Sequence, residues 1–240
     1  HAWLEKETGQ KINARPYVDS GPVLERDLAQ RAGLGWFGKN TCLINPKAGS
    51  FLFLASLFVE FPLQPDVPFE ADRCGTCTRC LDACPTQALT APRVLDANLC
   101  ISYLTIELRE AIPVELREPV GELVYGCDIC QDVCPWNVSF SKELTETAFE
   151  PRKFLRGRSA RELSHEILAM SQSEFSAAFR NSPMKRAKRR GLARNAAVVL
   201  GNIGNADDVP VLQKALQHDE ELVHEHAAWA LNQLHRRHTS

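Results

Sequence analysis

The chain has 240 residues, of which 44% are hydrophobic and 24% charged, with a formal net charge of −2. These values are ordinary for a globular protein. The most apolar run, GSFLFLASLFVEF, is shorter than the roughly 20 residues of a membrane span, and the N-terminus shows no secretory signal. We therefore expect a cytoplasmic protein of two or three small domains that does not associate with a membrane.

Nine cysteines are spread unevenly along the chain. Because their number is odd and they cluster at metal-ligand spacing, we expect a reducing compartment and no disulfide framework. The stretch CGTCTRCLDACP reproduces the C-x2-C-x2-C-x3-C-P run of bacterial two-cluster ferredoxins, in which the fourth cysteine binds the other cluster. A tetrahedral zinc site would need only two cysteines in such a loop. The run therefore predicts iron–sulfur clusters.

A second run, CDICQDVCP at residues 127–135, has one cysteine fewer. Cys100, which lies 27 positions before Cys127, is the best candidate for the missing ligand. By the crossed-ligand rule, we predict two [4Fe–4S] clusters, the first bound by Cys74, Cys77, Cys80 and Cys134 and the second by Cys84, Cys100, Cys127 and Cys130. The insert 101–126 is longer than a ferredoxin needs, which indicates a further role. Cys42 is expected to be a small buried hydrophobic residue rather than a reactive thiol.

Residues 14–60 predict a strand, a turn, a helix, a glycine-rich turn and two further strands. The DSG sequence at 19–21 is typical of a turn, and Pro22 suits the first position of a helix that ends near Gly33. The segment GLGWFG matches the dinucleotide fingerprint G-x-G-x-x-G, which normally follows a strand and opens a helix. Here it follows the expected helix and precedes the expected strand TCLI, so we exclude a dinucleotide site.

Asp19 has two interpretations. The Ser-Gly-Pro that follows it favours a carboxylate that stabilises the turn or caps the helix. The alternative is a general acid at the mouth of a site, where burial would raise its pKa enough to hold a proton near neutrality. The spacing alone favours the first interpretation.

After Asn137 the cysteines stop and the composition favours helices. The segments RNAAVVLGNIGNADDVPVLQKALQ and HEHAAWALNQLHRR align at an offset of 31 residues, which indicates paired helices of a small HEAT-like module. The aligned pairs are Ala197 with Ala228, Leu200 with Leu231 and Ile203 with Leu234.

Residues 180–194 contain seven Lys or Arg and no acidic residue. Such a run can be a solvated helix face. Because the run is dense and adjoins a helical scaffold, contact with a nucleic-acid backbone is the favoured interpretation.

Together these segments resemble epoxyqueuosine reductase, the iron–sulfur and cobalamin family of queuosine tRNA modification. The resemblance rests on YVDSGPVLERDLAQRAGLGWFGKNTCLINPKAGSF, CGTCTRCLDACPTQAL, CISYLTIELRE, YGCDICQDVCPWN and RNAAVVLGN, and it covers nearly the whole chain in order. The family has a longer N-terminal part that carries some cobalamin contacts. We expect this chain, which begins with histidine, to lack that part.

The resemblance implies reductive removal of the epoxide oxygen of epoxyqueuosine at the tRNA wobble position, with electrons passed through both clusters to cobalamin. The aspartate of the family's Val-Asp-Ser/Thr-Gly-Pro motif, here Asp19, is then the proton donor, which reverses the preference from spacing. The implied contacts to the cofactor or the substrate base are Arg26, Lys39, Asn40, Thr41, Ser50, Ser102, Asp128 and Ile129. The implied tRNA contacts are Tyr103, Thr105, Lys185, Arg186, Lys188, Arg189, Arg190, Arg194 and Asn195.

The expected fold class is α+β and multidomain. Residues 1–68 would be the C-terminal part of an α/β cobalamin-binding catalytic domain, 69–139 a ferredoxin-like domain with the insert, and 140–240 an all-α HEAT-like tRNA-binding module. We expect a monomer that binds the anticodon stem-loop and takes electrons from an external donor. Two alternatives stay open. One is a cobalamin-dependent dehalogenase-like reductase, which would need no helical repeat; the other is a non-catalytic ferredoxin-type module that binds nucleic acid.

Overall fold

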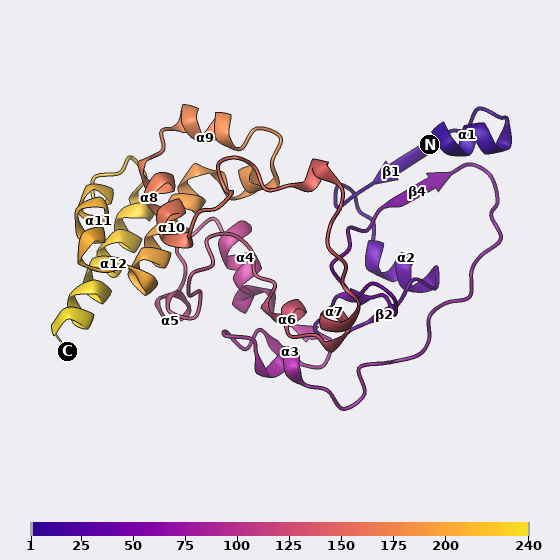
Figure 1. The fold of residues 1–240 in the computed structure, drawn as a ribbon, viewed down its shortest axis with the longest axis horizontal. Helices are drawn as coiled ribbons and strands as arrows, with labels where there is room; N and C mark the ends of the chain where they lie inside the picture. The colour runs from indigo at the N-terminus through magenta and orange to yellow at the C-terminus, as the bar shows by residue number, and fades with distance from the viewer. Residues whose placement is uncertain (1, 240) are drawn as a thin grey trace. The chain divides into compact units, whose positions relative to one another are not determined.

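A computed structural model describes residues 2–239, which form both helices and strands (Figure 1). They divide into two units that interleave along the chain. The first unit runs from the N-terminus to Ala83 and includes Leu89–Leu95 and Ile129–Glu143. The second contains Cys84–Ala88, Asp96–Asp128 and the chain from Leu144 onward. The expected boundaries after residues 68 and 139 do not coincide with this division, and the three-domain organisation stays a prediction.

Short strands and helices build the first unit. Its strands pair as three antiparallel two-stranded sheets, β1 with β4, β2 with β3 and β5 with β6. The strands are β1 Ala14–Tyr17, β2 Trp36–Phe37, β3 Leu43–Ile44, β4 Ser56–Val59, β5 Leu89–Ala91 and β6 Val94–Leu95, and the helices are α1 Ala2–Thr8, α2 Glu25–Arg31, α3 Arg79–Asp82, α6 Ile129–Asp132 and α7 Pro135–Phe140.

The glycine-rich segment before β3 forms a hairpin rather than a dinucleotide loop. A Cβ on Gly35 would lie 2.1 Å from the carbonyl oxygen of Ile44, and a Cβ on Gly38 would lie 2.5 Å from the Ile44 side chain. Glycine is therefore required because β2 and β3 approach closely. The segment follows α2 and precedes β3, as the sequence predicted, but it contains strand β2 where only a turn was expected.

The turn before α2 differs from the expectation. The helix begins at Glu25, so Pro22 lies before it instead of at its first position. Asp19 has a φ of +48°, a left-handed conformation that aspartate tolerates better than most residues. The predicted end of the helix is confirmed, since α2 ends at Arg31 and Gly33 follows with a φ of +70°.

Helices build the second unit. They are η1 Ala97–Leu99, α4 Ile101–Ile106, α5 Val114–Arg117, η2 Thr147–Phe149, α8 Ala160–Ala169, α9 Gln172–Ala178, η3 Pro183–Ala187, α10 Lys188–Ile203, η4 Ala206–Asp208, α11 Val209–Ala215 and α12 Glu221–Thr239. A serine is the N-cap residue of both α8 and α9. Each forms a capping box with a glutamate, Ser159 with Glu162 and Ser171 with Glu174.

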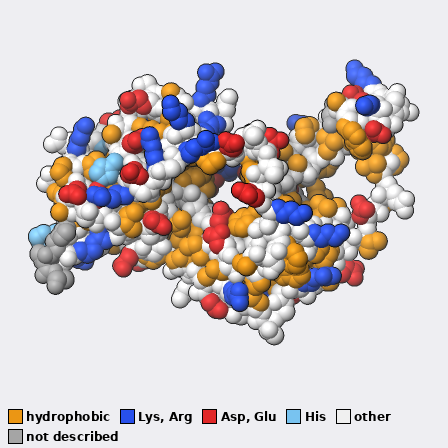
Figure 2. Space-filling view, in the orientation of Figure 1, with side chains coloured by type: hydrophobic (Ala, Val, Ile, Leu, Met, Phe, Trp, Pro, Cys, Tyr) orange, Lys and Arg blue, Asp and Glu red, His pale blue; other side chains and the backbone are white. Residues whose placement is uncertain are grey.

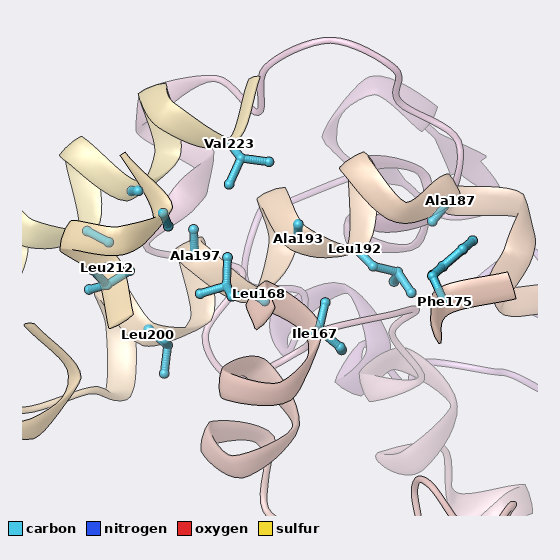
Figure 3. Packing of buried hydrophobic residues seen from close by; sticks show 14 of the residues in the cluster. Ile167, Leu168, Phe175, Ala187, Leu192, Ala193, Ala197, Leu200, Leu212 and Val223 are labelled. Carbon is cyan, nitrogen blue, oxygen red and sulfur yellow. The ribbon is translucent and has the colours of Figure 1, made fainter. Parts of the chain in front are cut away.

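Helix α10 is the centre of this unit and packs against α8 and α12. Leu192, Ala193, Ala197 and Leu200 are fully buried among side chains of α8, α9, α11 and α12 (Figure 3). A helix whose residues are buried on nearly every side lies inside a bundle, whereas an outer helix keeps one face exposed to solvent. Its burial therefore shows that α10 is the central helix around which the other helices of the unit pack.

The insert 101–126 lies in the helical unit. Ile101, Leu104, Ile112 and Val120 form a buried cluster with Val198 of α10. The extra residues between the cysteine runs thus bury an apolar face against α10, a role that their number alone could not show.

The repeat alignment at an offset of 31 residues does not match the observed burial. It pairs buried Ala197 with exposed Ala228, and exposed Ile203 with buried Leu234. The alignment fails because α10 is covered on nearly all sides while α12 exposes one face, so equal spacing does not give equal environments.

In residues 2–239, no helix combines the length and apolarity that crossing a bilayer requires.

Candidate functional site

Four cysteines line one cavity in the first unit. They are Cys74, Cys77, Cys80 and Cys134, and the cavity has a volume of about 200 Å³. These are the four residues that the sequence assigned to the first cluster, although 50 positions separate Cys134 from Cys84, the last cysteine of the first run. Local spacing brings the first three together, and the packing of α3 against α6 brings the last one close.

The thiols of this cavity are the predicted ligands of the first iron–sulfur cluster. Cys134 is the N-cap of α7, with Pro135 at the first helical position. The pKa of the Cys80 thiol is raised, chiefly by burial and further by Cys74 and Cys134. Iron binding removes these protons, because a cluster is ligated by thiolates.

An aromatic wall borders the cavity. The indole N–H of Trp36 donates to Cys74 Sγ at 3.4 Å. The Trp36 ring stacks on Phe69 at 5.5 Å and meets Trp136 edge-on at 4.9 Å between ring centroids. An N–H donor to sulfur and a dry apolar wall both affect the reduction potential of an iron–sulfur cluster. Trp36 was not among the predicted site residues, and its position within the glycine motif GLGWFG is the only sequence signal that points to it.

Two side chains expected at the corrin hold the cysteine loops. Lys39 Nζ donates to the carbonyl oxygens of Gly75 at 2.7 Å and Cys77 at 2.9 Å. Asn40, which is buried, donates to the carbonyl of Cys130 at 3.2 Å. Their polar groups therefore fix the backbone of both cysteine runs, and contact with cobalamin stays a prediction for them.

Ser50 belongs to a buried network beside α6 and α7. Its hydroxyl donates to Gln131 Oε1 at 2.8 Å and accepts from Asn137 Nδ2 at 2.9 Å. Asn137 also donates to the Gln131 carbonyl at 2.8 Å. This network holds α6 against α7, and no sequence motif pointed to Asn137 as part of it.

Asp19, Arg26 and Thr41 lie on the loops around α2. Asp19 is exposed, and its backbone N–H donates to Glu25 Oε1 at 3.1 Å. Leu24 occupies the N-cap position of α2 and no side chain caps it, so the capping interpretation of Asp19 is wrong. Arg26, also exposed, donates to the carbonyl of Thr41 at 2.5 Å, which brings two of the predicted cofactor contacts together.

Three cysteines of the predicted second cluster belong to the helical unit, namely Cys84, Cys100 and Cys127, whereas Cys130 belongs to the first unit. Cys100 is the N-cap of α4 with φ −70° and ψ 123°, the same backbone conformation as Cys134 before α7. Cys84 Sγ accepts from the backbone N–H of Ala88 at 3.3 Å. The four-cysteine set of this cluster stays a prediction.

Asp128 is exposed, and Ile129 begins α6. Ser102 was expected at the cofactor, but its hydroxyl donates to the carbonyl of Cys127 at 3.2 Å and accepts from the Cys127 N–H at 3.0 Å. Its observed role is therefore to hold a predicted cluster ligand.

Within residues 2–237, no three His, Cys, Asp or Glu side chains converge closely enough to hold a single metal ion. A cubane does not require such convergence, since each of its four irons takes one thiolate.

The basic stretch separates into exposed and buried residues. Lys185, Arg186 and Lys188 are exposed and Arg190 is partly exposed. Figure 2 shows Lys and Arg side chains on the surface of the helical unit. Tyr103, another expected RNA contact, is partly buried against the cluster around Ile101. RNA contact stays a prediction for these residues.

Four other residues expected at the tRNA are wrong as surface contacts, because they are buried. Arg189 is 8% exposed and pairs with Asp219 and the carbonyl of Met170. Thr105, Arg194 and Asn195 are fully buried. A buried charge or amide must be bonded internally, so these side chains stabilise the unit.

Residues 73–137 match a family model described as a 4Fe-4S double cluster binding domain. This match confirms the prediction of two clusters. The cysteines of both runs lie inside the matched segment, together with the insert.

The chain is 46% identical over 220 residues to the epoxyqueuosine reductase of Xanthomonas campestris, covering 91% of this chain and 60% of the relative. It is 48% identical over 220 residues to that of Pseudomonas aeruginosa, covering 90% and 59%. It is 46% identical over 222 residues to that of Escherichia coli K12, covering 92% and 57%. The chain thus spans about 60% of the length of these curated relatives.

Solved structures give the same result. An epoxyqueuosine reductase from Bacillus subtilis, with its catalytic loop swung out of the active site, matches at a TM-score of 0.84 and 34% identity, covering 97% of this chain and 60% of that chain. An epoxyqueuosine reductase with a tRNA-Tyr epoxyqueuosine-modified stem loop matches at 0.82 and 33%, covering 97% and 61%. Over about nine-tenths of its own length and about three-fifths of theirs, the chain is therefore similar to epoxyqueuosine reductases.

Proposed function

We propose that the protein containing this chain reduces epoxyqueuosine to queuosine at the wobble position of tRNA. The observation that carries the proposal is the identity of 46–48% to epoxyqueuosine reductases over about nine-tenths of the chain. The cavity lined by the four cysteines of the first cluster supports it. The reaction removes the epoxide oxygen as water, so it consumes two electrons and two protons.

The cysteine runs account for the electrons. Each cluster carries one electron at a time, and two clusters held by crossed ligands lie close enough to exchange electrons. When bound, cobalamin would bring a reduced metal to the epoxide carbon. Arg26, Thr41, Asp128 and Ile129 are the proposed direct contacts to cobalamin, while Lys39, Asn40 and Ser50 would act by fixing the cysteine loops.

Asp19 is the proposed proton donor. It lies on a turn that is held in a left-handed conformation, and such conformations are typical of functional loops. Its side chain does not serve as the cap of α2. A proton delivered to the epoxide oxygen as the C–O bond breaks avoids an alkoxide leaving group, which is the usual gain from general acid catalysis.

The helical unit is the proposed tRNA-binding part. Lys185, Arg186, Lys188 and Arg190 would contact backbone phosphates, which gives affinity that depends on salt, and Tyr103 would lie near the base. The relative solved with a tRNA-Tyr stem loop supports tRNA as a partner. We also propose that the helices are a HEAT-like module, that residues 1–68 belong to an α/β cobalamin domain, and that the protein is a cytoplasmic monomer with an external electron donor.

An anaerobic assay on the full gene product that contains these 240 residues tests the function. The substrate is an anticodon stem-loop carrying epoxyqueuosine, with cobalamin and a strong reductant. We expect queuosine only when cobalamin is present. Asp19→Asn should keep iron and cobalamin content and lose turnover, whereas the control Asp66→Asn, at another exposed aspartate of the first unit, should remain active.

Three outcomes would overturn parts of the proposal. Normal turnover in Asp19→Asn would remove Asp19 as the acid. No product from protein with verified clusters and bound corrin would favour a dehalogenase-like reductase. Intact clusters without corrin affinity would favour the non-catalytic electron-transfer module.

A further inference from the structure

The insert between the cysteine runs is tied to α10 by two adjacent polar side chains, Arg194 and Asn195. Both are fully buried. Asn195 Oδ1 accepts from Arg194 Nε at 3.0 Å and from Nη2 at 2.9 Å, so the two side chains act as one group. Burial lowers the pKa of Arg194 to about 10, so the guanidinium stays charged at neutral pH and must keep its partners.

The remaining donors of this pair all point to backbone carbonyls of the insert, at distances between 2.5 and 2.9 Å. The carbonyls belong to Leu104, Leu108 and Glu110 for Arg194, and to Thr105 and Val124 for Asn195. The last carbonyls of a helix have no partner within it. The pair therefore bonds the C-terminal end of α4 and fixes that end relative to residue 124.

The N-terminal end of α4 carries a predicted ligand of the second cluster. Cys100 is the N-cap of this helix. The Ser102 hydroxyl is bonded to both the N–H and the carbonyl of Cys127. One turn later, Thr105 Oγ1 accepts from the backbone N–H of Gly126 at 2.9 Å. One short helix thus positions two of the predicted ligands.

We propose that Arg194 and Asn195 are positioning residues for the second [4Fe–4S] cluster. By holding α4 and residue 124, they set the backbone geometry of Cys100 and Cys127, and with it the stability and reduction potential of the cluster. Groups that orient the ligands of a metal commonly have this effect. The inference rests on the cluster assignment within the proposed function.

Helix α10 offers a matched control. Asn202 lies seven positions after Asn195 and also donates to two backbone carbonyls of the insert, those of Arg117 at 2.8 Å and Gly121 at 3.0 Å. Arg117 is the last residue of α5 and Gly121 lies in the turn after it, and neither of these segments contains a cysteine. Asn202→Ala therefore loosens the insert without touching the ligand-bearing helix.

The experiment compares Asn195→Ala, Asn195→Asp and Asn202→Ala in the anaerobically purified holoprotein. Asn195→Asp keeps the oxygen that accepts from Arg194 and loses both amide N–H donors. It is the test variant if Asn195→Ala does not fold. The readouts are iron content and the midpoint potentials of both clusters, from a redox titration followed by electron paramagnetic resonance. Cys100→Ala identifies which signal belongs to the second cluster.

We expect either Asn195 variant to shift the midpoint of the second cluster, or to fall from about eight irons toward about four, while the first cluster is unchanged. Asn202→Ala should keep both clusters as in the parent protein. Unchanged iron and midpoints in the Asn195 variants, or equal effects in Asn202→Ala, would overturn the proposal. Because these readouts do not use turnover, failure of the proposed enzymatic function would be seen separately.

Discussion

Two glycines of α10 should respond in opposite directions to the same substitution. A Cβ on Gly201 would lie 2.4 Å from Trp229 Cζ3 and 3.0 Å from the Cα of Ala230, both on α12. A Cβ on Gly191 would lie 3.6 Å from the Ala187 Cβ, which is ordinary contact. The two sites therefore differ in the space available although they share a helix.

The magnitudes follow from two opposing effects. Alanine in place of glycine inside a helix stabilises by roughly 1 kcal/mol. Overpacking a core costs about 1–3 kcal/mol, and Gly201 faces backbone that cannot rotate away. We expect Gly191→Ala to raise the free energy of unfolding by about 1 kcal/mol and Gly201→Ala to lower it by a similar amount.

Thermal unfolding followed by far-ultraviolet circular dichroism measures this difference. For a unit of this size, 1 kcal/mol corresponds to a shift of a few degrees in the midpoint. The two variants should therefore move to opposite sides of the parent protein. If both raised the midpoint equally, helix propensity would outweigh packing at this contact and the reasoning from the α10–α12 distance would be refuted.

Three further predictions concern the clusters, the RNA and the pH. Cys100→Ala should lower iron from about eight per chain toward about four, and retention of all eight would refute its assignment as a ligand. Replacing Lys185 and Lys188 by Ala should weaken stem-loop binding and reduce the slope of log affinity against log salt by up to about one per lost phosphate contact. Lys214→Ala, an exposed lysine of α11, is the control, and an unchanged slope in the double variant would show a solvated face. Burial lowers the pKa of His226 from 6.5 to about 4. The neutral form of this side chain therefore contributes its full stabilisation above pH 6.5, and up to about 3 kcal/mol of the free energy of unfolding is lost as the pH falls toward 4. The urea midpoint should therefore fall more steeply with acid in the parent protein than in His226→Gln, and equal slopes would contradict this origin.

The part of the site that depends on local spacing could be predicted from the sequence. Cys74 and Cys77 lie on one loop and Cys80 lies in α3 directly after it, and the cavity they line follows from their separation along the chain. The distant ligand Cys134 could also be predicted, because the crossed-ligand pattern of ferredoxins is itself a sequence rule. The glycine hairpin was predictable to the extent that the order of helix and strands excluded a dinucleotide loop.

The direction in which a charged side chain points could not be predicted in the same way. In the run from Lys185 to Arg194, a count of charges cannot distinguish a lysine on the surface from an arginine in the core. Arg194 can be buried because backbone carbonyl oxygens about 90 positions earlier in the chain accept hydrogen bonds from its guanidinium. Arg189 is buried because Asp219 lies opposite it. Such pairings depend on tertiary contacts, and no local pattern encodes them.

The two clusters therefore depend on different parts of the fold, although their ligands come from the same pair of motifs. All four predicted ligands of the first cluster lie in the unit that also supplies Trp36, Lys39 and the Asn137 network. Three predicted ligands of the second lie in the helical unit, where α4 and α10 hold their backbone. RNA is the proposed ligand of the helical unit. The unit that would bind the substrate therefore also supports the predicted ligands of the second cluster. A ferredoxin with a short link between its runs has no such connection, and this gives a physical reason for the length of the insert.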